Sequence, residues 1–123
     1  MKVSIFSDKD FRYKDCKELF YKSNETLEEA LDFDSLIKKY QLFQYTHENK
    51  LIGCLYYYFE DDKLFVATFA NKGFAKEKYK CLKESLTYYD CDIYARTKQR
   101  HVAIVLLRCG FKKISDNLYK YER

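Results

Sequence analysis

Apolar residues recur along this chain in two patterns, one typical of strands and the other of helices. Residues 2–6 alternate between apolar and polar side chains, and residues 42–46, 51–59 and 64–69 form apolar runs too short to be helices. Polar turns separate the last three runs, which predicts consecutive strands joined by tight turns. Because residues 51–59 are apolar almost throughout, we expect a central strand there with both faces covered.

Helical spacing predicts helices over residues 8–22, from Thr26 onward with a break near 32–34, over 75–89, and over a segment that stops at Gly110. Thr26 followed by Glu29 forms a capping-box pattern, which supports a helix start at Thr26. A short strand at 91–95 and a terminal hairpin around 115–117 complete the chain. The predicted order is β-α-α-β-β-β-α-β-α-β-β, a single α/β domain over residues 1–123.

Composition narrows the classes of protein that this pattern fits. The chain has 123 residues, 47% hydrophobic and 34% charged, as expected for one globular domain. No apolar run is long enough to cross a membrane, and residues 1–10 lack the apolar segment of a signal peptide. Five scattered cysteines without a Cys-x-x-Cys pair argue against a metal site, and we expect reduced thiols in a cytoplasmic protein. The net charge of +4 suits an anionic cofactor or partner without requiring nucleic acid.

The stretch from residue 64 to residue 111 contains a predicted strand, a glycine turn, a helix, a second strand and a second helix. A strand, helix and strand in one sheet form a parallel crossover. Glycine is scarce, and we expect Gly53, Gly73 and Gly110 to lie where the backbone requires it; Gly53 indicates a bulge or a close backbone approach. Because the turn at Gly73 precedes a helix, its free N–H groups predict phosphate binding beside parallel strands.

Residues 70–75 read Ala-Asn-Lys-Gly-Phe-Ala, and Gly110-Phe111 follows the last predicted helix. Together with the order of elements, these motifs resemble the GNAT superfamily, the acetyl-CoA-dependent N-acyltransferases. The cofactor loop of that family reads Gln/Arg-x-x-Gly-x-Gly/Ala; the Gly-x-Ala end is present, while Ala70 replaces the leading Gln/Arg. The resemblance covers nearly the whole chain and implies a mixed, mostly antiparallel central sheet with helices on both faces.

A second family motif reads roughly Asn-x-x-Ala-x-x-x-Tyr, with Gly-Phe four residues later. Counting back from Gly110 places Gln99, Val102 and Leu106 at its three named positions. The spacing and the Gly-Phe ending are therefore present, and the polar residues of the motif are not.

The resemblance implies a site for acetyl-CoA, and an acetyl transfer to an amine of a small molecule or a protein. In the family, the amides of the loop bind the pyrophosphate. The pantetheine arm binds the strand backbone in a gap between the strands, here residues 64–69 and 91–95. A further contact is implied at the start of the last helix. The implied residues are Val66, Ala67, Thr68, Phe69, Lys72, Gly73, Phe74, Ala75 and Gln99. Lys72 and Lys76 could add charge-assisted contacts to phosphate.

The implied reaction needs a base for the amine and an acid for the leaving thiolate. The family often uses the Tyr of its second motif as the acid, and Leu106 occupies that position. The sequence identifies no single replacement. The candidates for the acid are Tyr94, Tyr119 and Tyr121, or water; those for the base are Tyr56, Tyr58, Glu60, His47 and His101. Cys109 is expected to be a small core residue.

Two other functions remain open. Leu106, Ala70 and the aromatic run 56–59 favour a non-catalytic GNAT-fold protein that binds a protein partner, with or without coenzyme A. A basic segment suggests RNA binding; its residues are Lys98, Arg100, Arg108, Lys112 and Lys113. The many acidic residues and the lack of an RNA-binding motif argue against nucleic acid. The sequence leaves the acceptor and a homodimer undecided.

Overall fold

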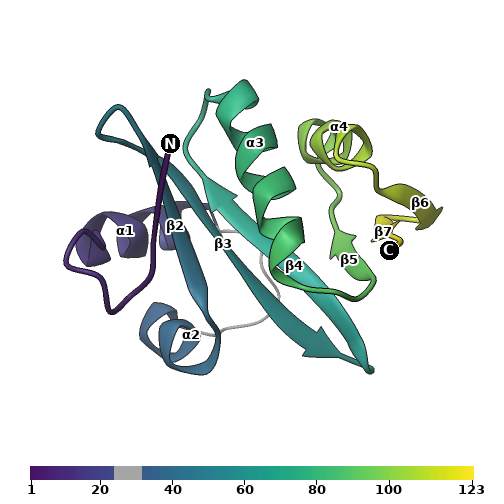
Figure 1. Cartoon of the computed structure of the whole chain (residues 1–123), viewed down its shortest axis with the longest axis horizontal. Coiled ribbons are helices and arrows are strands. Elements are labelled where there is room, and N and C mark those ends of the chain that lie inside the picture. Colours follow the sequence, from purple (N-terminus) through teal and green to yellow (C-terminus); the bar gives the residue numbers. More distant parts are fainter. Residues whose placement is uncertain (24–31) are drawn as a thin grey trace. The chain divides into compact units, whose positions relative to one another are not determined.

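Figure 1 shows a computed structural model of the chain, which describes residues 1–23 and 32–123. The strands are β1 (Lys2–Ser4), β2 (Leu42–His47), β3 (Lys50–Glu60), β4 (Lys63–Ala70), β5 (Ile93–Arg96), β6 (Lys112–Ser115) and β7 (Leu118–Tyr121). The helices are α1 (Tyr13–Ser23), α2 (Phe33–Lys39), α3 (Ala75–Ser85) and α4 (Arg100–Arg108), with a short 3₁₀ helix at Leu86–Tyr88. The predicted order of elements is confirmed.

The described strands form one seven-stranded sheet in the order β1-β2-β3-β4-β5-β7-β6. β1, β2 and β3 pair antiparallel, β4 pairs with β5 in parallel, and β7 pairs antiparallel with both β5 and β6. The mixed, mostly antiparallel sheet is therefore confirmed. Within it the chain forms two compact units, Met1–Tyr56 with Thr68–Phe74, and Tyr57–Ala67 with Ala75–Arg123.

The two hairpin turns around β3 have the backbone that tight turns require. Glu48 and Asn49 have φ angles of 51° and 65°, and Asp61 and Asp62 have φ angles of 52° and 61°. Consecutive left-handed residues are typical of two-residue hairpin loops, whose twist matches that of the strands. The turns predicted from polar residues are confirmed.

The core of the first unit packs α1 and α2 against the sheet. Its buried members are Cys16, Leu19, Phe20, Phe33, Leu36, Leu42, Leu51, Cys54 and Phe69. α2 begins after Asp32, whose carboxylate accepts a hydrogen bond from the amide of Ser35 (2.8 Å). The predicted helix start at Thr26 lies outside the described residues.

The prediction that the first helix begins near Asp8 is wrong, because α1 begins at Tyr13. The Asp8 carboxylate accepts a hydrogen bond from the amide of Ile5 (2.8 Å), and the Asp8 carbonyl accepts one from Phe11 (3.1 Å). Aspartate that bonds nearby backbone in this way stabilises a turn in competition with a helix.

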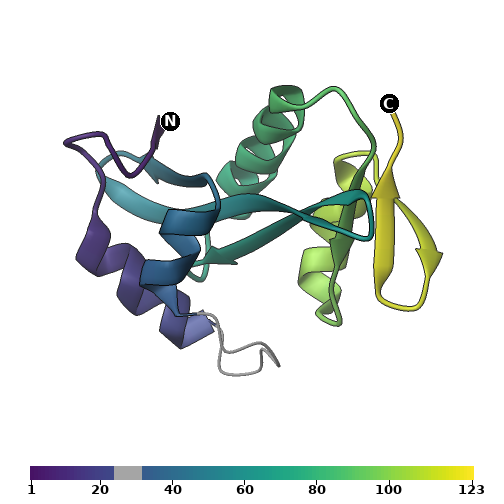
Figure 2. The ribbon, with the colours of Figure 1, turned by 90° about the horizontal axis from the view of Figure 1, so that it is seen from below.

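In the second unit, α3 is tied to β3 by a buried hydrogen bond of 2.8 Å between the hydroxyls of Tyr57 and Ser85. α4 ends in a Schellman motif: Phe111 N–H donates to Leu106 O (3.0 Å) and Gly110 N–H donates to Leu107 O (3.1 Å). Gly110 has a φ of 104°, which explains why this helix ends at a glycine. Figure 2 shows α4 beside the β6–β7 hairpin that follows it.

Two strand predictions need correction. β5 covers Ile93–Arg96 rather than 91–95; just before it, the carboxylate of Asp92 accepts a hydrogen bond from the amide of Arg123 (3.0 Å). β3 is central in the sheet as predicted, but its faces are not covered along its whole length. Leu55 is buried, whereas Phe59 near the end of the strand is 72% exposed.

Candidate functional site

The loop between β4 and α3 has a left-handed backbone at two consecutive residues. Gly73 has a φ of 84° and Phe74 a φ of 58°, and α3 begins at the next residue, Ala75. A Cβ added to Gly73 would meet nothing within 4 Å, so this position requires glycine for its conformation and not for clearance. Phe74 adopts a conformation that costs a non-glycine residue about 1–2 kcal/mol, and such strain often lies at functional sites.

The start of this loop is fixed to β3 by Asn71. Its backbone N–H donates to the carbonyl of Ile52 (2.9 Å), and its side-chain amide donates to the carbonyl of Leu51 (2.8 Å). Gly53 lets the end of β4 approach β3 closely, because a Cβ at Gly53 would lie only 2.6 Å from the carbonyl oxygen of Phe69. The close backbone approach expected at Gly53 is confirmed, and the role of Asn71 was not foreseen.

The parallel pairing of β4 with β5 is short. It joins Leu64 to Ile93 and Phe65 to Tyr94. Beyond these pairs β5 continues through residues 95–96, which pair with β7, and β4 continues to residue 70. The described pairing therefore ends while both strands continue, and the backbone that follows Phe65 has no register partner on β5. A strand edge of this kind can hydrogen-bond an extended ligand.

Aromatic and charged side chains gather around Phe65, on β4, at the point where this pairing ends. Tyr58 stacks on Phe65 with ring centroids 5.4 Å apart, and Tyr94 lies 5.6 Å away on the other neighbouring strand. The guanidinium of Arg96 lies 4.2 Å from the centre of the Phe65 ring and forms an ion pair with Glu60. Of the catalytic candidates, Tyr58, Tyr94 and Glu60 therefore lie in this cluster.

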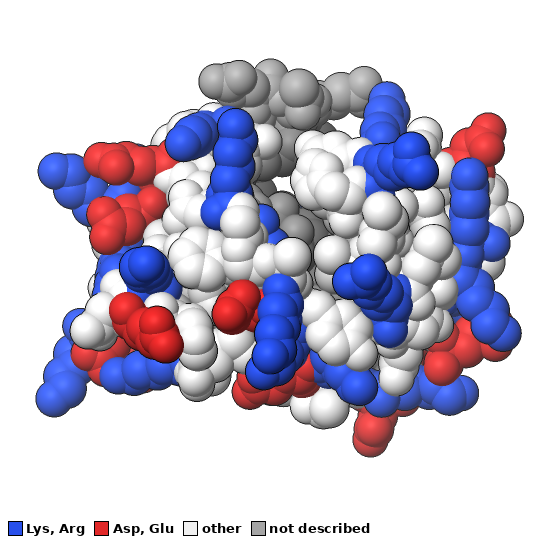
Figure 3. All heavy atoms as spheres, turned by 90° about the horizontal axis from the view of Figure 1, so that it is seen from above, with Lys and Arg blue, Asp and Glu red and all other residues white. Residues whose placement is uncertain are grey.

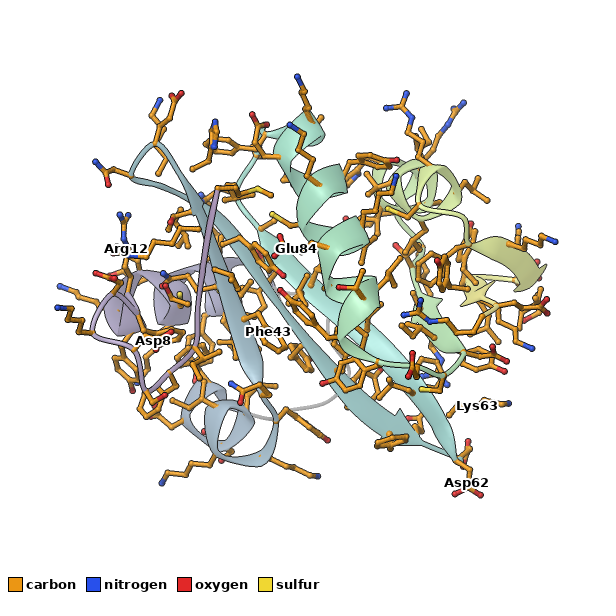
Figure 4. The ribbon with its side chains drawn as sticks, in the orientation of Figure 1. Asp8, Arg12, Phe43, Asp62, Lys63 and Glu84 are labelled. Carbon is orange, nitrogen blue, oxygen red and sulfur yellow. The ribbon has the colours of Figure 1, made fainter. Side chains whose placement is uncertain are left out.

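Two lysines lie near the ring of Tyr94. The ammonium of Lys63, which is labelled in Figure 4 at the start of β4, is 5.5 Å from the ring centre. The ammonium of Lys120 is 5.6 Å from it and forms ion pairs with Asp92 (3.6 Å) and Glu122 (3.5 Å). Tyr94 thus has two ammonium groups near its ring, on the same side of the sheet as Phe65.

The other catalytic candidates of the second unit lie apart from this cluster. Tyr119 pairs opposite Ala95, one residue beyond Tyr94, so its buried side chain points to the other face of the sheet. His101 is exposed in the first turn of α4. Tyr121 packs against Phe111, with ring centroids 5.5 Å apart.

The segment from Gln99 to Phe111, which contains the second motif, ends and packs α4. Leu106, at the position of the family's Tyr, is 3% exposed and its carbonyl accepts the Schellman hydrogen bond from Phe111. Gln99 is the N-cap residue of α4, and its amide donates to the hydroxyl oxygen of Thr97 (3.0 Å) while its side chain makes no capping bond. Leu106 therefore belongs to the core, and Gln99 is exposed at a helix start.

The buried thiols are unsuited to nucleophilic chemistry. Burial raises the pKa of Cys109 to about 11 and that of Cys81 to about 12. Since the thiolate is the reactive form, both are largely unreactive near neutral pH. Among the residues that the structure describes, no group of His, Cys, Asp and Glu could hold a metal ion, and no helix is long and apolar enough to cross a membrane.

Comparison of the structure with solved structures shows what this architecture resembles. The crystal structure of an N-acetyltransferase from Staphylococcus aureus Mu50 superposes with a TM-score of 0.69 at 13% sequence identity, covering 98% of this chain and 96% of that chain. The chain therefore has a GNAT-like fold. The crystal structure of smu.2055 from Streptococcus mutans UA159 matches with a TM-score of 0.65 at 14% identity, covering 99% of both chains. No protein-family model and no curated protein matches the sequence.

Within the GNAT-like fold, sequence reasoning missed three residues that shape the site: Asn71, Phe65 and Arg96. The polar Asn71 stood inside the quoted loop motif, but its partners on β3 lie about twenty positions away. Phe65 belonged to an apolar run, which predicts a strand and not an aromatic cluster. The ion pair of Arg96 with Glu60 joins two strands that are distant in the sequence, so no local pattern predicts it.

Proposed function

We propose that this chain binds acetyl-CoA and transfers its acetyl group to an amine. The observation that carries the proposal is the short β4–β5 pairing, which leaves the β4 backbone after Phe65 without a register partner on β5. In a GNAT-like fold that edge is suited to the amides of the pantetheine arm. The backbone groups that would bind the arm are those of Val66, Ala67, Thr68 and Phe69.

The loop that follows this edge is suited to the pyrophosphate. The amides of Lys72, Gly73, Phe74 and Ala75 come at a left-handed turn and at the first residue of an eleven-residue helix, where N–H groups have no intrahelical partner. Lys72 and Lys76 are exposed beside them and would add positive charge. Gln99 would add a polar contact at the start of α4.

When bound, the thioester supplies an activated acetyl group. The residues of the chain would orient the amine, take its proton and return a proton to the leaving sulfur. Tyr94 is the best-supported proton donor, because it lies on β5 where the pairing with β4 ends and is half-buried. Its hydroxyl could donate the proton that the side chain of Leu106 cannot donate.

Replacing Tyr94 by Phe should lower kcat about a hundredfold, the low end of the range for general acid–base catalysis. KM for acetyl-CoA should change little, because the ring and its packing against Phe65 remain. Tyr88→Phe is the matched control, as it removes the hydroxyl of a tyrosine that bonds Glu84 and is not a catalytic candidate. Steady-state acetylation rates measure both, and an unchanged kcat in Tyr94→Phe would assign the proton to water or another residue.

Titration of the purified protein with acetyl-CoA and with CoA by calorimetry tests the proposal. We expect micromolar dissociation constants for both ligands, since they share the pyrophosphate and pantetheine groups. A screen of amine acceptors then follows. Absence of binding at millimolar ligand would overturn the proposal.

A second candidate function is binding of a protein partner without catalysis. It is favoured by Leu106 at the position of the family's Tyr and by three exposed aliphatic side chains, Ile104 (42%), Leu107 (51%) and Ile114 (50%), on α4 and β6. Coenzyme A binding without turnover of any amine would support it. RNA binding is less favoured, since blue and red side chains are interspersed on the face drawn in Figure 3, unlike the stripe of one sign typical of such sites.

A further inference from the structure

Asn71 joins the end of β4 to the left-handed turn, and it does so with two hydrogen bonds to consecutive carbonyls. Its side-chain amide donates to Leu51 O (2.8 Å) and its backbone N–H donates to Ile52 O (2.9 Å). Two bonds from one residue restrain both the position and the rotation of the chain at that point. The residues that continue from Asn71 are Lys72 and Gly73, which are both exposed.

Ile52, which accepts one of these hydrogen bonds, lies at a bulge in the pairing of β3 with β2. Tyr45 of β2 pairs with Gly53 and Thr46 pairs with Leu51, so Ile52 has no register partner on β2. A bulge adds one residue to a strand and redirects its backbone locally. On its other side, towards β4, the carbonyl of Ile52 accepts the hydrogen bond of the Asn71 amide (2.9 Å).

Gly53 brings the two partners within reach. A Cβ at Gly53 would lie 2.7 Å from Cα of Ala70, the residue before Asn71. Glycine therefore permits an approach of β4 to β3 that any side chain would prevent. Gly53 and Asn71 together form one anchor for the start of the loop.

We propose that Asn71 is a positioning residue for the phosphate-binding loop, an inference that rests on the proposed acetyl-CoA site. Asn71 does not itself need to touch the ligand. Its anchor holds the amides of residues 72–74 in one arrangement before the ligand arrives. Without the anchor, binding would have to order these residues, and the ordering entropy would be subtracted from the affinity.

The test compares two ligands and two substitutions. Asn71→Leu keeps the approximate size of the side chain but removes its N–H donor without adding a charge, and Asn71→Ala removes the polar group. The ligands are CoA, and acetyl-pantetheine, which lacks the pyrophosphate. We expect Kd for CoA to rise about tenfold or more in both variants, while Kd for acetyl-pantetheine changes less than twofold. Calorimetry measures the first and ligand-observed NMR the second.

Asn49→Ala is the matched control, because it makes the same chemical change as Asn71→Ala at an exposed turn residue. It should leave both affinities unchanged. Equal losses for both ligands, or failure of both Asn71 variants to fold, would show a structural role and overturn the inference. Unchanged CoA affinity in the variants would also overturn it, whereas failure of the unmodified protein to bind CoA would overturn the acetyl-CoA site and the inference with it.

Discussion

Gly73→Glu should abolish the binding of CoA and leave the protein folded. The side chain would enter open space, since nothing lies within 4 Å of the position of its Cβ. Its carboxylate would stand beside the proposed pyrophosphate site, where a like charge about 4 Å away costs about 4 kcal/mol at the effective dielectric of a protein surface. We therefore expect Kd to rise roughly a thousandfold. Calorimetry of the variant with CoA measures the effect.

The left-handed backbone at Gly73 separates the effect of charge from that of strain. With a φ of 84°, any side chain at this position costs about 1 kcal/mol of folding free energy. Gly73→Gln has the same strain and size as Gly73→Glu without the charge, so it should fold equally well and bind CoA with only a small loss. Equal affinities of the two variants would place the pyrophosphate elsewhere. Thermal unfolding confirms that both remain folded.

Gly53→Ala should destabilise the protein by roughly 3 kcal/mol, the upper part of the range for overpacking. The new methyl group would lie 2.6 Å from the carbonyl oxygen of Phe69 and 2.7 Å from Cα of Ala70. Both contacts are to backbone, so they cannot be relieved by rotating a side chain. The end of β4 would have to move away from β3, and the hydrogen bonds of Asn71 would weaken with it. The melting temperature should fall by roughly 10 °C.

Gly73→Ala is the control for Gly53→Ala, because it replaces a glycine by the same residue where the surrounding space is open. It should cost only about 1 kcal/mol, the strain of its positive φ. Urea unfolding of both variants measures the two free energies. A loss below 1 kcal/mol at Gly53 would mean that β3 and β4 separate easily, and the proposed anchor at Asn71 would lose its support.

The sequence by itself determined the order of the elements and several of their ends. Tight turns at Glu48–Asn49 and Asp61–Asp62 follow from polar residues that tolerate a left-handed backbone, and the end of α4 follows from Gly110. These features depend on interactions within a few residues, which local sequence encodes directly. The resemblance of the loop and the Gly-Phe motif to the GNAT superfamily also predicted the fold that the solved structures share.

Only the tertiary structure decided how the candidate site is assembled. The register that ends the β4–β5 pairing at Phe65 and Tyr94 depends on how whole strands align, and no single residue encodes it. The same alignment places Tyr58 against Phe65 and leaves Tyr119 on the opposite face of the sheet. The anchor of Asn71 likewise joins segments about twenty residues apart. Contacts between distant segments exist only once the chain has folded, so apolar spacing and short motifs reveal the elements but not these partners.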